Sequence, residues 1–374
     1  MIKLIIDLLL KKGWMLLSNL FISMILFYYV GSEAWSIVVI FLSLNMLGLI
    51  FGIGIKSKTS LSDNDNDICI NYYSMLIINF LTILGMFLFY YIKGIDNYLI
   101  LFFSLILVIL SNVNSFYQGF FLYSGEIKKS TDILMKANMF KLLAFMFLFF
   151  IYKKVYLFFI LQFLEQVYIY ARSVRKKPTI NFDHKNIFSR LKELFYISIG
   201  SIPFIFVSST LQIDIARSMS ATSAGYFGLF VQLINSVRSV FIFIVTNFQK
   251  KMLSYRHYFK KILNFCIGSL VFLVGILLIN LLGVVNINYE GYILVSLVNF
   301  TYLIILLVAN IQNIFKLNKI SFNISLLFVF FLGIGWLVDY ITIIGVAFWV
   351  TIYMISMLLR AFIVNSAFLK LNKD

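Results

Sequence analysis

Charged residues are scarce in this chain. They account for 12% of its 374 residues, whereas 62% of the residues are hydrophobic. Soluble domains contain roughly 25% charged and 45–50% apolar residues. Proline occurs only twice. The composition therefore excludes an ordinary soluble domain and indicates a protein whose surface faces lipid.

Histidine and cysteine are almost absent, with two residues of each. His184 and His257 fall in segments that we expect to be cytoplasmic loops, which excludes a histidine-based metal centre. Cys69 and Cys266 fall on or near the same side, where thiols stay reduced, so no disulfide framework is expected. The sequence also lacks a Walker A loop and a complete GxGxxG motif. We expect no nucleotide hydrolysis, no metal and no cofactor.

Apolar segments recur from one end of the chain to the other. Most are about 20 residues long, which is enough to cross roughly 30 Å of hydrocarbon at about 1.5 Å per residue. None shows the strict alternation of β-barrel strands. We therefore predict an all-α polytopic membrane protein with about twelve transmembrane helices. The predicted spans cover residues 14–30, 35–55, 72–92, 97–123, 137–152, 155–171, 194–214, 224–247, 262–285, 291–310, 321–338 and 341–365.

Lysine and arginine concentrate in alternate loops between these spans. If the N-terminus is cytoplasmic, 24 of the 31 basic residues fall in cytoplasmic segments, four fall in the opposite loops and three lie within spans. Basic residues of short loops stay in the cytoplasm. We therefore predict a multi-pass protein with both termini in the cytoplasm. Because this topology accounts for the net charge of +16, no nucleic-acid partner is expected.

The longest loop divides the spans into two sets of six. It is basic and contains Pro178. Aligning the chain with itself at a shift of 190 residues matches Asn45 with Asn235. Parallel repeats of this kind are related by a pseudo-two-fold axis along the membrane normal, and the substrate path lies between them. We predict an N-terminal six-helix lobe at residues 1–171, a basic cytoplasmic linker at 172–193 and a C-terminal six-helix lobe at 194–374.

Two short stretches carry a resemblance to a known family. The first is the opening LLLKKGWMLLSNL followed by YYVGSEAWSIVVIFLSL, in which a basic cap and a first helix lead into a Gly-small-acid-Ala-aromatic turn. The second, DIARSMSATSAGYFGLFVQL, echoes it in the second half. Together with the number of spans and the repeat, they resemble the O-antigen and capsule repeat-unit flippases of the multidrug/oligosaccharidyl-lipid/polysaccharide exporter superfamily.

This resemblance implies a substrate, a location and a mechanism. The substrate would be an undecaprenyl-diphosphate-linked oligosaccharide, the location the bacterial inner membrane, and the mechanism alternating access through a central cationic cavity. The implied partners are the lipid bilayer, a polysaccharide polymerase, a chain-length regulator and a coupling ion, H⁺ or Na⁺. Only differential binding to the two states of a transporter can drive its motion in one direction, so some gradient or removal of product has to be coupled to it.

One permanent cation lies in the middle of the apolar segment 224–247. A lone arginine at midspan costs roughly 2.5–3.5 kcal/mol on insertion scales, so it persists only with partners, water or a function. Helical periodicity places Arg238 at the edge of a polar face that includes Gln232 and Asn235. A guanidinium donates two parallel hydrogen bonds to phosphate oxygens. We predict that these three residues contact the anionic head group, the alternative being an arginine that snorkels or pairs within the fold.

Lys141 and Glu165 lie in consecutive spans at nearly the same depth. Lys141 is 12 residues before the loop at Lys153-Lys154, and Glu165 is 11 residues after it. An antiparallel hairpin would pair them. We list Lys141 as a substrate-binding candidate and Glu165 as a candidate for proton coupling, and a purely structural ion pair stays an equal alternative.

Three further charged residues lie near the ends of spans. Asp214 and Asp339 are near the predicted outer boundary and are candidates for coupling or for local ion pairs. Arg360 is near the inner end of the last span, where we expect it to snorkel to the interface.

Two other classes of function stay open. A small-molecule or drug exporter of the same superfamily would enclose a free solute, and a lipid-accessible gap between the lobes would separate the two cases. An integral membrane polymerase or transferase acting at the outer face would need a sizeable outer loop with acids, arginines or histidines, and the predicted outer loops are short. We therefore predict a transporter, and not an enzyme.

Overall fold

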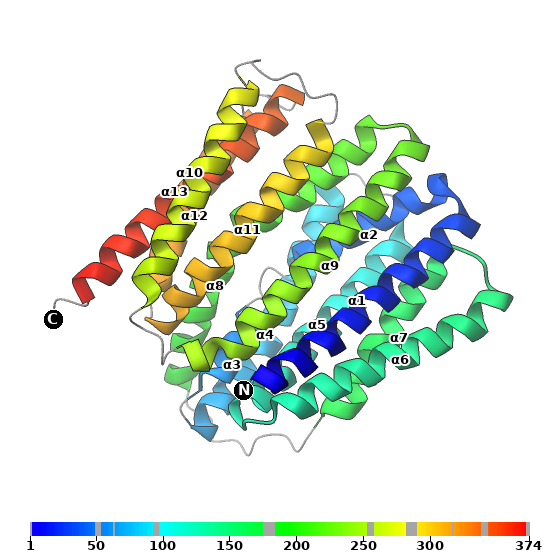
Figure 1. Ribbon diagram of the computed structural model, residues 1–374, viewed down its shortest axis with the longest axis horizontal. Coiled ribbons are helices and arrows are strands. Elements are labelled where there is room, and N and C mark those ends of the chain that lie inside the picture. Colours follow the sequence, from blue (N-terminus) through cyan, green and yellow to red (C-terminus); the bar gives the residue numbers. More distant parts are fainter. Residues whose placement is uncertain are drawn as a thin grey trace. The chain divides into compact units, whose positions relative to one another are not determined.

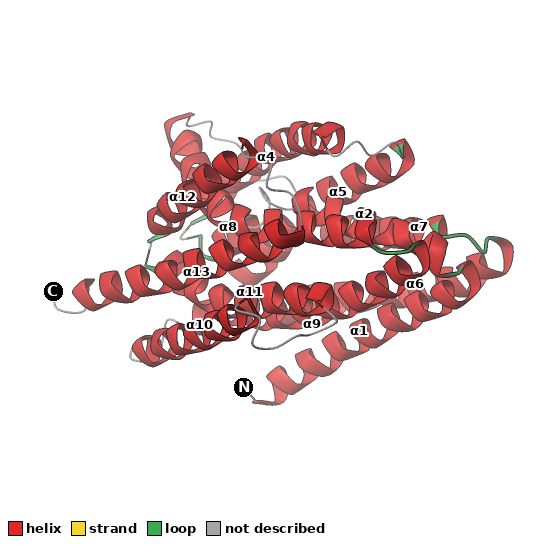
Figure 2. Ribbon diagram, turned by 90° about the horizontal axis from the view of Figure 1, so that it is seen from above, coloured by secondary structure: helices red, strands yellow, loops and turns green. Residues whose placement is uncertain are grey.

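The computed structural model describes residues 2–48, 54–62, 64–92, 97–174, 184–252, 258–281, 290–315, 317–337 and 343–371. Within these ranges the chain forms thirteen α-helices and no β-strand (Figure 1; Figure 2).

The helices follow one another with short connections. Those in the first half are α1 (Ile2–Val30), α2 (Ser32–Gly48), α3 (Ile55–Ser60), α4 (Asp65–Ile92), α5 (Tyr98–Tyr123), α6 (Ile127–Ile151) and α7 (Tyr156–Ser173). Those in the second half are α8 (His184–Ser218), α9 (Ala221–Met252), α10 (Phe259–Leu281), α11 (Glu290–Ile314), α12 (Asn318–Leu337) and α13 (Ile343–Leu371). Each predicted span has a long helix of its own, and α3 is an additional short helix.

The predicted end of the second span is wrong. It was placed at Ile55, but α2 ends at Gly48, and Ile55 is the first residue of the separate helix α3. Residues 49–53, between these two helices, lie outside the described residues.

Six of the described helices are long and apolar enough to cross a membrane. They contain the segments Leu10–Val30, Asp65–Leu88, Tyr98–Tyr123, Ile127–Ile151, Tyr292–Ile314 and Val350–Lys370. On α1, the exposed side chains of Leu10, Leu17 and Met24 recur every seven residues and form one apolar stripe. An outward-facing stripe of this kind suits lipid and not water. The helical content and these spans confirm an all-α multi-pass membrane protein.

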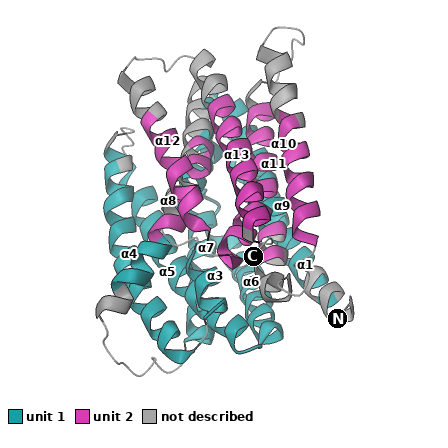
Figure 3. Ribbon diagram, turned by 90° about the vertical axis from the view of Figure 1, so that its left-hand side faces the viewer, with its two compact units in different colours: residues 1–194, 212–240 teal, residues 195–211, 241–374 magenta. Residues whose placement is uncertain are grey.

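The chain forms two compact units, coloured separately in Figure 3. Unit 1 consists of residues 1–194 and 212–240, and unit 2 of residues 195–211 and 241–374. Helices α8 and α9 contribute residues to both. This division differs from the predicted lobes, whose boundaries at residues 171 and 194 stay a prediction. Part of the predicted linker, residues 175–183, lies outside the described residues, and α8 begins within it at His184.

Unit 1 is held together by aromatic packing between α2, α5 and α7. Trp35 and Phe41 of α2 are fully buried, as are Phe158 and Phe159 of α7. The rings of Phe41 and Phe159 stack with centroids 4.2 Å apart, and Trp35 meets Phe158 edge-on at 5.5 Å. Helix α6 packs against α7 and α1. In a membrane such contacts act mainly through close van der Waals packing.

Two glycines fix the entry of helices into this unit. Gly31, with a φ of +89°, makes the turn between α1 and α2 that a residue with a Cβ would adopt only under strain. Gly225 brings α9 so close to α2 that an added Cβ would lie 2.0 Å from the carbonyl oxygen of Ser32. Small residues allow such an approach between membrane helices. As a result, the first turns of α9 lie directly against α2.

Candidate functional site

Unit 1 contains a polar cavity of about 330 Å³. This volume is near the lower end of the range for ligand pockets, about 300–1,000 Å³. Its walls come from α1, α2, α5, α7 and α9. The polar lining residues are Lys12, Asn19, Asn45, Ser111, Gln162, Glu165, Gln166, Gln232, Asn235, Ser236 and Ser239, and the apolar ones are Phe41, Leu42, Leu107, Val108 and Phe158.

Two charged residues line this cavity, and a third lies behind one of them. Lys141 of α6 forms an ion pair with Glu165 of α7, and the two side chains are 1% and 14% exposed. Lys12 of α1 also lines the cavity, and the charges of both Glu165 and Lys141 act on it. Two lysines and one glutamate give this cluster a formal net charge of +1. A buried excess of positive charge attracts an anion.

The hairpin of α6 and α7 explains why Lys141 and Glu165 meet. The two helices are antiparallel and are joined by residues 152–155. Between the same two helices, the ring of Phe140 stacks on that of Tyr168 with centroids 5.3 Å apart. The structure thus brings together the two residues that their equal depth suggested, and their roles stay predictions.

Hydrogen bonds hold several lining amides in place. The amide nitrogen of Asn114 donates to the side-chain oxygen of Gln166 at 2.8 Å, and that of Asn138 donates to the side-chain oxygen of Asn19 at 3.2 Å. Gln232 donates to the hydroxyl of Ser23 on α1. These bonds orient the amides of α1, α7 and α9 before any ligand arrives.

Three amide oxygens of the lining have no hydrogen-bond partner among the described residues. They belong to Asn45, Gln232 and Asn235, and all three are buried. A buried acceptor without a donor costs roughly 1–3 kcal/mol. A ligand rich in hydroxyl groups would supply the missing donors once these side chains turn into the cavity.

Of the three residues of α9 that were predicted to bind the substrate, two line this cavity and one does not. Gln232 and Asn235 line it, as do Ser236 and Ser239. Arg238 is half-buried and is not among the lining residues. Its contact with a head group stays a prediction.

The other predicted residues near the ends of spans lie elsewhere. Asp214 belongs to α8, where the structure describes the backbone at this position and not the side chain. Asp339 lies outside the described residues. The expectation that Arg360 snorkels is wrong, because its side chain is 6% exposed and lies inside unit 2. Its Nε donates to the side-chain oxygen of Gln312 at 2.9 Å, and its Nη1 donates to the carbonyl of Gly200 at 3.2 Å.

Sequence reasoning missed Lys12 as a site residue. It was counted with the cytoplasmic cations that precede the first span, which was taken to start at residue 14. Helix α1 in fact begins at Ile2 and carries Lys12, Asn19 and Ser23 with spacings of seven and four residues. These spacings place the three side chains on one helix face. Extending the helical periodicity toward the N-terminus would have grouped them.

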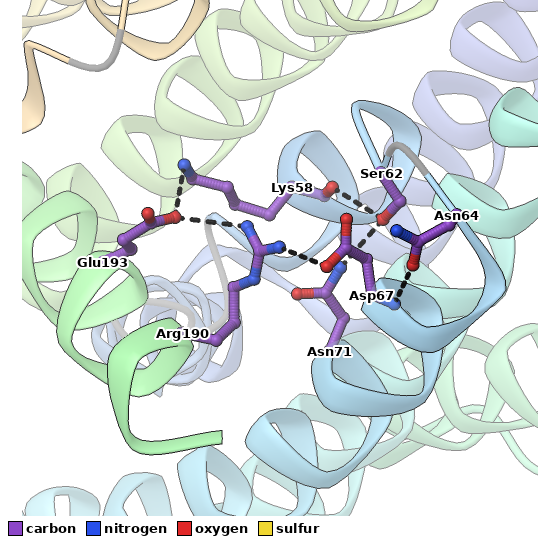
Figure 4. A network of polar contacts seen from close by, with 7 residues as sticks. All are labelled: Lys58, Ser62, Asn64, Asp67, Asn71, Arg190 and Glu193. Carbon is purple, nitrogen blue, oxygen red and sulfur yellow. Dashed lines mark hydrogen bonds and ion pairs between the residues drawn. The ribbon is translucent and has the colours of Figure 1, made fainter. Parts of the chain in front are cut away.

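A second polar cluster lies at the ends of α3, α4 and α8 (Figure 4). Lys58 of α3 pairs with Glu193 of α8 at 2.9 Å, and Arg190 of α8 pairs with Glu193 at 3.2 Å and with Asp67 of α4 at 3.1 Å. Asn71 of α4 donates to the hydroxyl of Ser62 at 3.1 Å. These ion pairs connect the first turns of α8 to α3 and α4, and we assign the cluster a structural role.

Comparisons with known proteins bear on the fold. Neither a protein-family model nor a curated protein sequence matches this chain. A crystal structure of a mutant MATE protein is similar over 98% of this chain and 97% of its own, with 12% sequence identity and a TM-score of 0.50. An inward-facing multidrug resistance MATE family transporter of the MOP superfamily is 13% identical and covers 97% of this chain and 96% of its own, with a TM-score of 0.48. A mutant of the Vibrio cholerae MATE transporter VcmN is 12% identical and covers 97% of both chains, with a TM-score of 0.49. The likeness with a TM-score of 0.50 shows that the chain has the fold of the MATE proteins.

Proposed function

We propose that this protein translocates undecaprenyl-diphosphate-linked oligosaccharide repeat units across the bacterial inner membrane by alternating access. One observation supports this most directly: the same cavity combines an excess of positive charge with three buried amide oxygens that lack donors. Phosphate oxygens accept charge-assisted hydrogen bonds from ammonium groups. Sugar hydroxyls donate to amide oxygens. A sugar phosphate therefore offers acceptors to the ammonium groups and donors to the amide oxygens of the lining.

The size of the cavity limits how much of the substrate it holds. About 330 Å³ suits a diphosphate with its nearest sugar and is too small for a long polyprenyl chain. In this proposal the head group enters the cavity while the lipid tail stays in the bilayer. The coupled gradient, of H⁺ or Na⁺, supplies the differential binding that gives the cycle its direction.

Export of a free solute is the second candidate. It is favoured by the apolar part of the lining, in which the rings of Phe41 and Phe158 and the side chains of Leu107 and Val108 face the cavity. Such walls suit a flat apolar molecule. The excess positive charge disfavours the cationic members of this class, so an anionic or neutral solute would be expected.

Reconstitution tests the proposed function. Purified protein in proteoliposomes is expected to move a fluorescent, diphosphate-linked disaccharide on a short polyprenyl chain from the outer to the inner leaflet, measured by quenching with an impermeant reductant. The double variant Asn45→Leu with Asn235→Leu is expected to lose most of this activity, because it removes two of the acceptors for sugar hydroxyls.

The matched control is Asn310→Leu. Asn310 is also a buried membrane amide, but its side chain bonds to the carbonyl of Leu306 in its own helix. This variant is expected to retain the activity of the unmodified protein. No movement of the lipid-linked sugar, together with export of a free solute, would overturn the proposal in favour of the second candidate.

A further inference from the structure

Glu165 is placed between the cavity and a buried cation. Its carboxylate lines the cavity and is 14% exposed, whereas the ammonium of Lys141 behind it is 1% exposed. An anion that enters the cavity therefore meets Glu165 before it can reach Lys141. For the anion to bind this lysine, the carboxylate has to leave it.

Lys12 gives the carboxylate a second cation within electrostatic range. It lines the same cavity and interacts with both Glu165 and Lys141. Two cations thus share one internal anion. This arrangement offers an entering anion one formal positive charge beyond the one that the carboxylate neutralises, which offsets part of the cost of bringing negative charge into the membrane.

We propose that Glu165 is an internal counter-ion that an entering phosphate displaces from Lys141. The inference rests on the proposed function and adds a mechanism of exchange at its site. While the cavity is empty, Glu165 neutralises Lys141 and keeps this part of the fold stable. When a phosphate group arrives, it takes the position on Lys141, and the carboxylate turns toward Lys12. No covalent bond changes, and Lys141 keeps an anionic partner throughout.

This exchange predicts that the native carboxylate weakens phosphate binding. Removing a competitor raises the affinity of the group with which it competes, and such couplings typically correspond to factors of about 5 to 150. Glu165→Gln keeps the shape and a hydrogen-bond acceptor for Lys141 while removing the charge. We expect it to bind inorganic pyrophosphate about tenfold more tightly than the unmodified protein.

The test is calorimetric titration of the purified full-length protein with inorganic pyrophosphate. The matched control is Glu126→Gln, since Glu126 forms an exposed ion pair with Lys129 at 3.4 Å outside the cavity. This control is expected to leave the affinity unchanged. The double variant Glu165→Gln with Lys141→Met is expected to lose the gain, because the cation for which the two anions compete is gone. It also keeps the charges balanced and so guards against misfolding of a single variant.

The outcomes separate this inference from the proposed function. A gain in pyrophosphate affinity for Glu165→Gln that the double variant abolishes supports the exchange, even if no lipid-linked sugar is translocated in proteoliposomes. Unchanged or weaker pyrophosphate binding by folded Glu165→Gln overturns the exchange, even if translocation is observed. An equal gain in the Glu126→Gln control would also overturn it, because the effect would then be one of net charge.

Discussion

Replacing Glu165 and replacing Lys141 should destabilise the protein by different amounts. Glu165→Leu leaves the ammonium of Lys141, which is 1% exposed, with almost no access to water. Breaking a buried ion pair in this way costs about 3–5 kcal/mol. Lys141→Met leaves a carboxylate that is 14% exposed, lines the cavity and interacts with Lys12. We expect this loss to be smaller, at about 1–3 kcal/mol. The double variant should be close to the unmodified protein, because apolar replacement of a whole buried pair is often neutral.

Thermal unfolding in one detergent, followed by the fluorescence of the four tryptophans, measures these differences. The unfolding midpoint is expected to fall most for Glu165→Leu, less for Lys141→Met and least for the double variant. A double-mutant cycle then gives a coupling of about 4 kcal/mol or more, far above the usual error for residues that do not interact. Equal and additive losses would refute the reasoning, because they would show that neither residue depends on the other.

Three further changes test other parts of the structure by the same unfolding assay. Arg190→Met removes one cation from two partly buried ion pairs and should cost about 1–3 kcal/mol, with a smaller effect in high salt. Burial, and then the nearby charge of Lys12, lowers the pKa of Lys56, which lies in α3 outside the candidate spans, to about 8. Between about pH 8 and 10.5, Lys56 is therefore protonated in the unfolded state but largely neutral in the native state. Because the unfolded state binds more protons, the free energy of unfolding should rise with pH across that window. Lys56→Met should abolish this rise, and an unchanged rise would count against it. Gly225→Ala should destabilise by at least about 1–3 kcal/mol through a backbone clash, whereas Gly13→Ala, with no atom within 4 Å, should not.

The helices could be predicted from the sequence because lipid imposes a simple rule on the chain. Every backbone polar group in the hydrocarbon region has to be paired internally, so a long apolar segment in this chain means a helix. Hydropathy therefore located every long helix in the part of the chain that the structure describes. It placed the end of the second one at Ile55, which belongs to the separate helix α3, since apolar character alone does not show where one helix ends and the next begins.

The cavity was only partly predictable, and the reason differs from residue to residue. Gln232 and Asn235 were found because they share a polar face of one helix. Lys12 was missed because the count of basic residues treats every cation before a span as cytoplasmic. Arg360 was misjudged because its distance from the end of a helix does not show that Gln312 of another helix is within reach.

The internal repeat supplies a last test of the charge of the cavity. The self-alignment matched Asn45 with Asn235, and both line the cavity with unpartnered oxygens. Asn45→Asp would keep the shape and reduce the charge of the cluster from about +1 to zero. A cavity of 330 Å³ is about 9 Å across, and two unit charges at that distance interact by about 1.8 kcal/mol at an effective dielectric constant near 20. Pyrophosphate affinity should therefore fall by at least about twentyfold, because pyrophosphate carries more than one negative charge. The neutral variant Asn45→Ser should keep most of the affinity, and if Asn45→Asp also keeps it, the anion does not bind in this cavity.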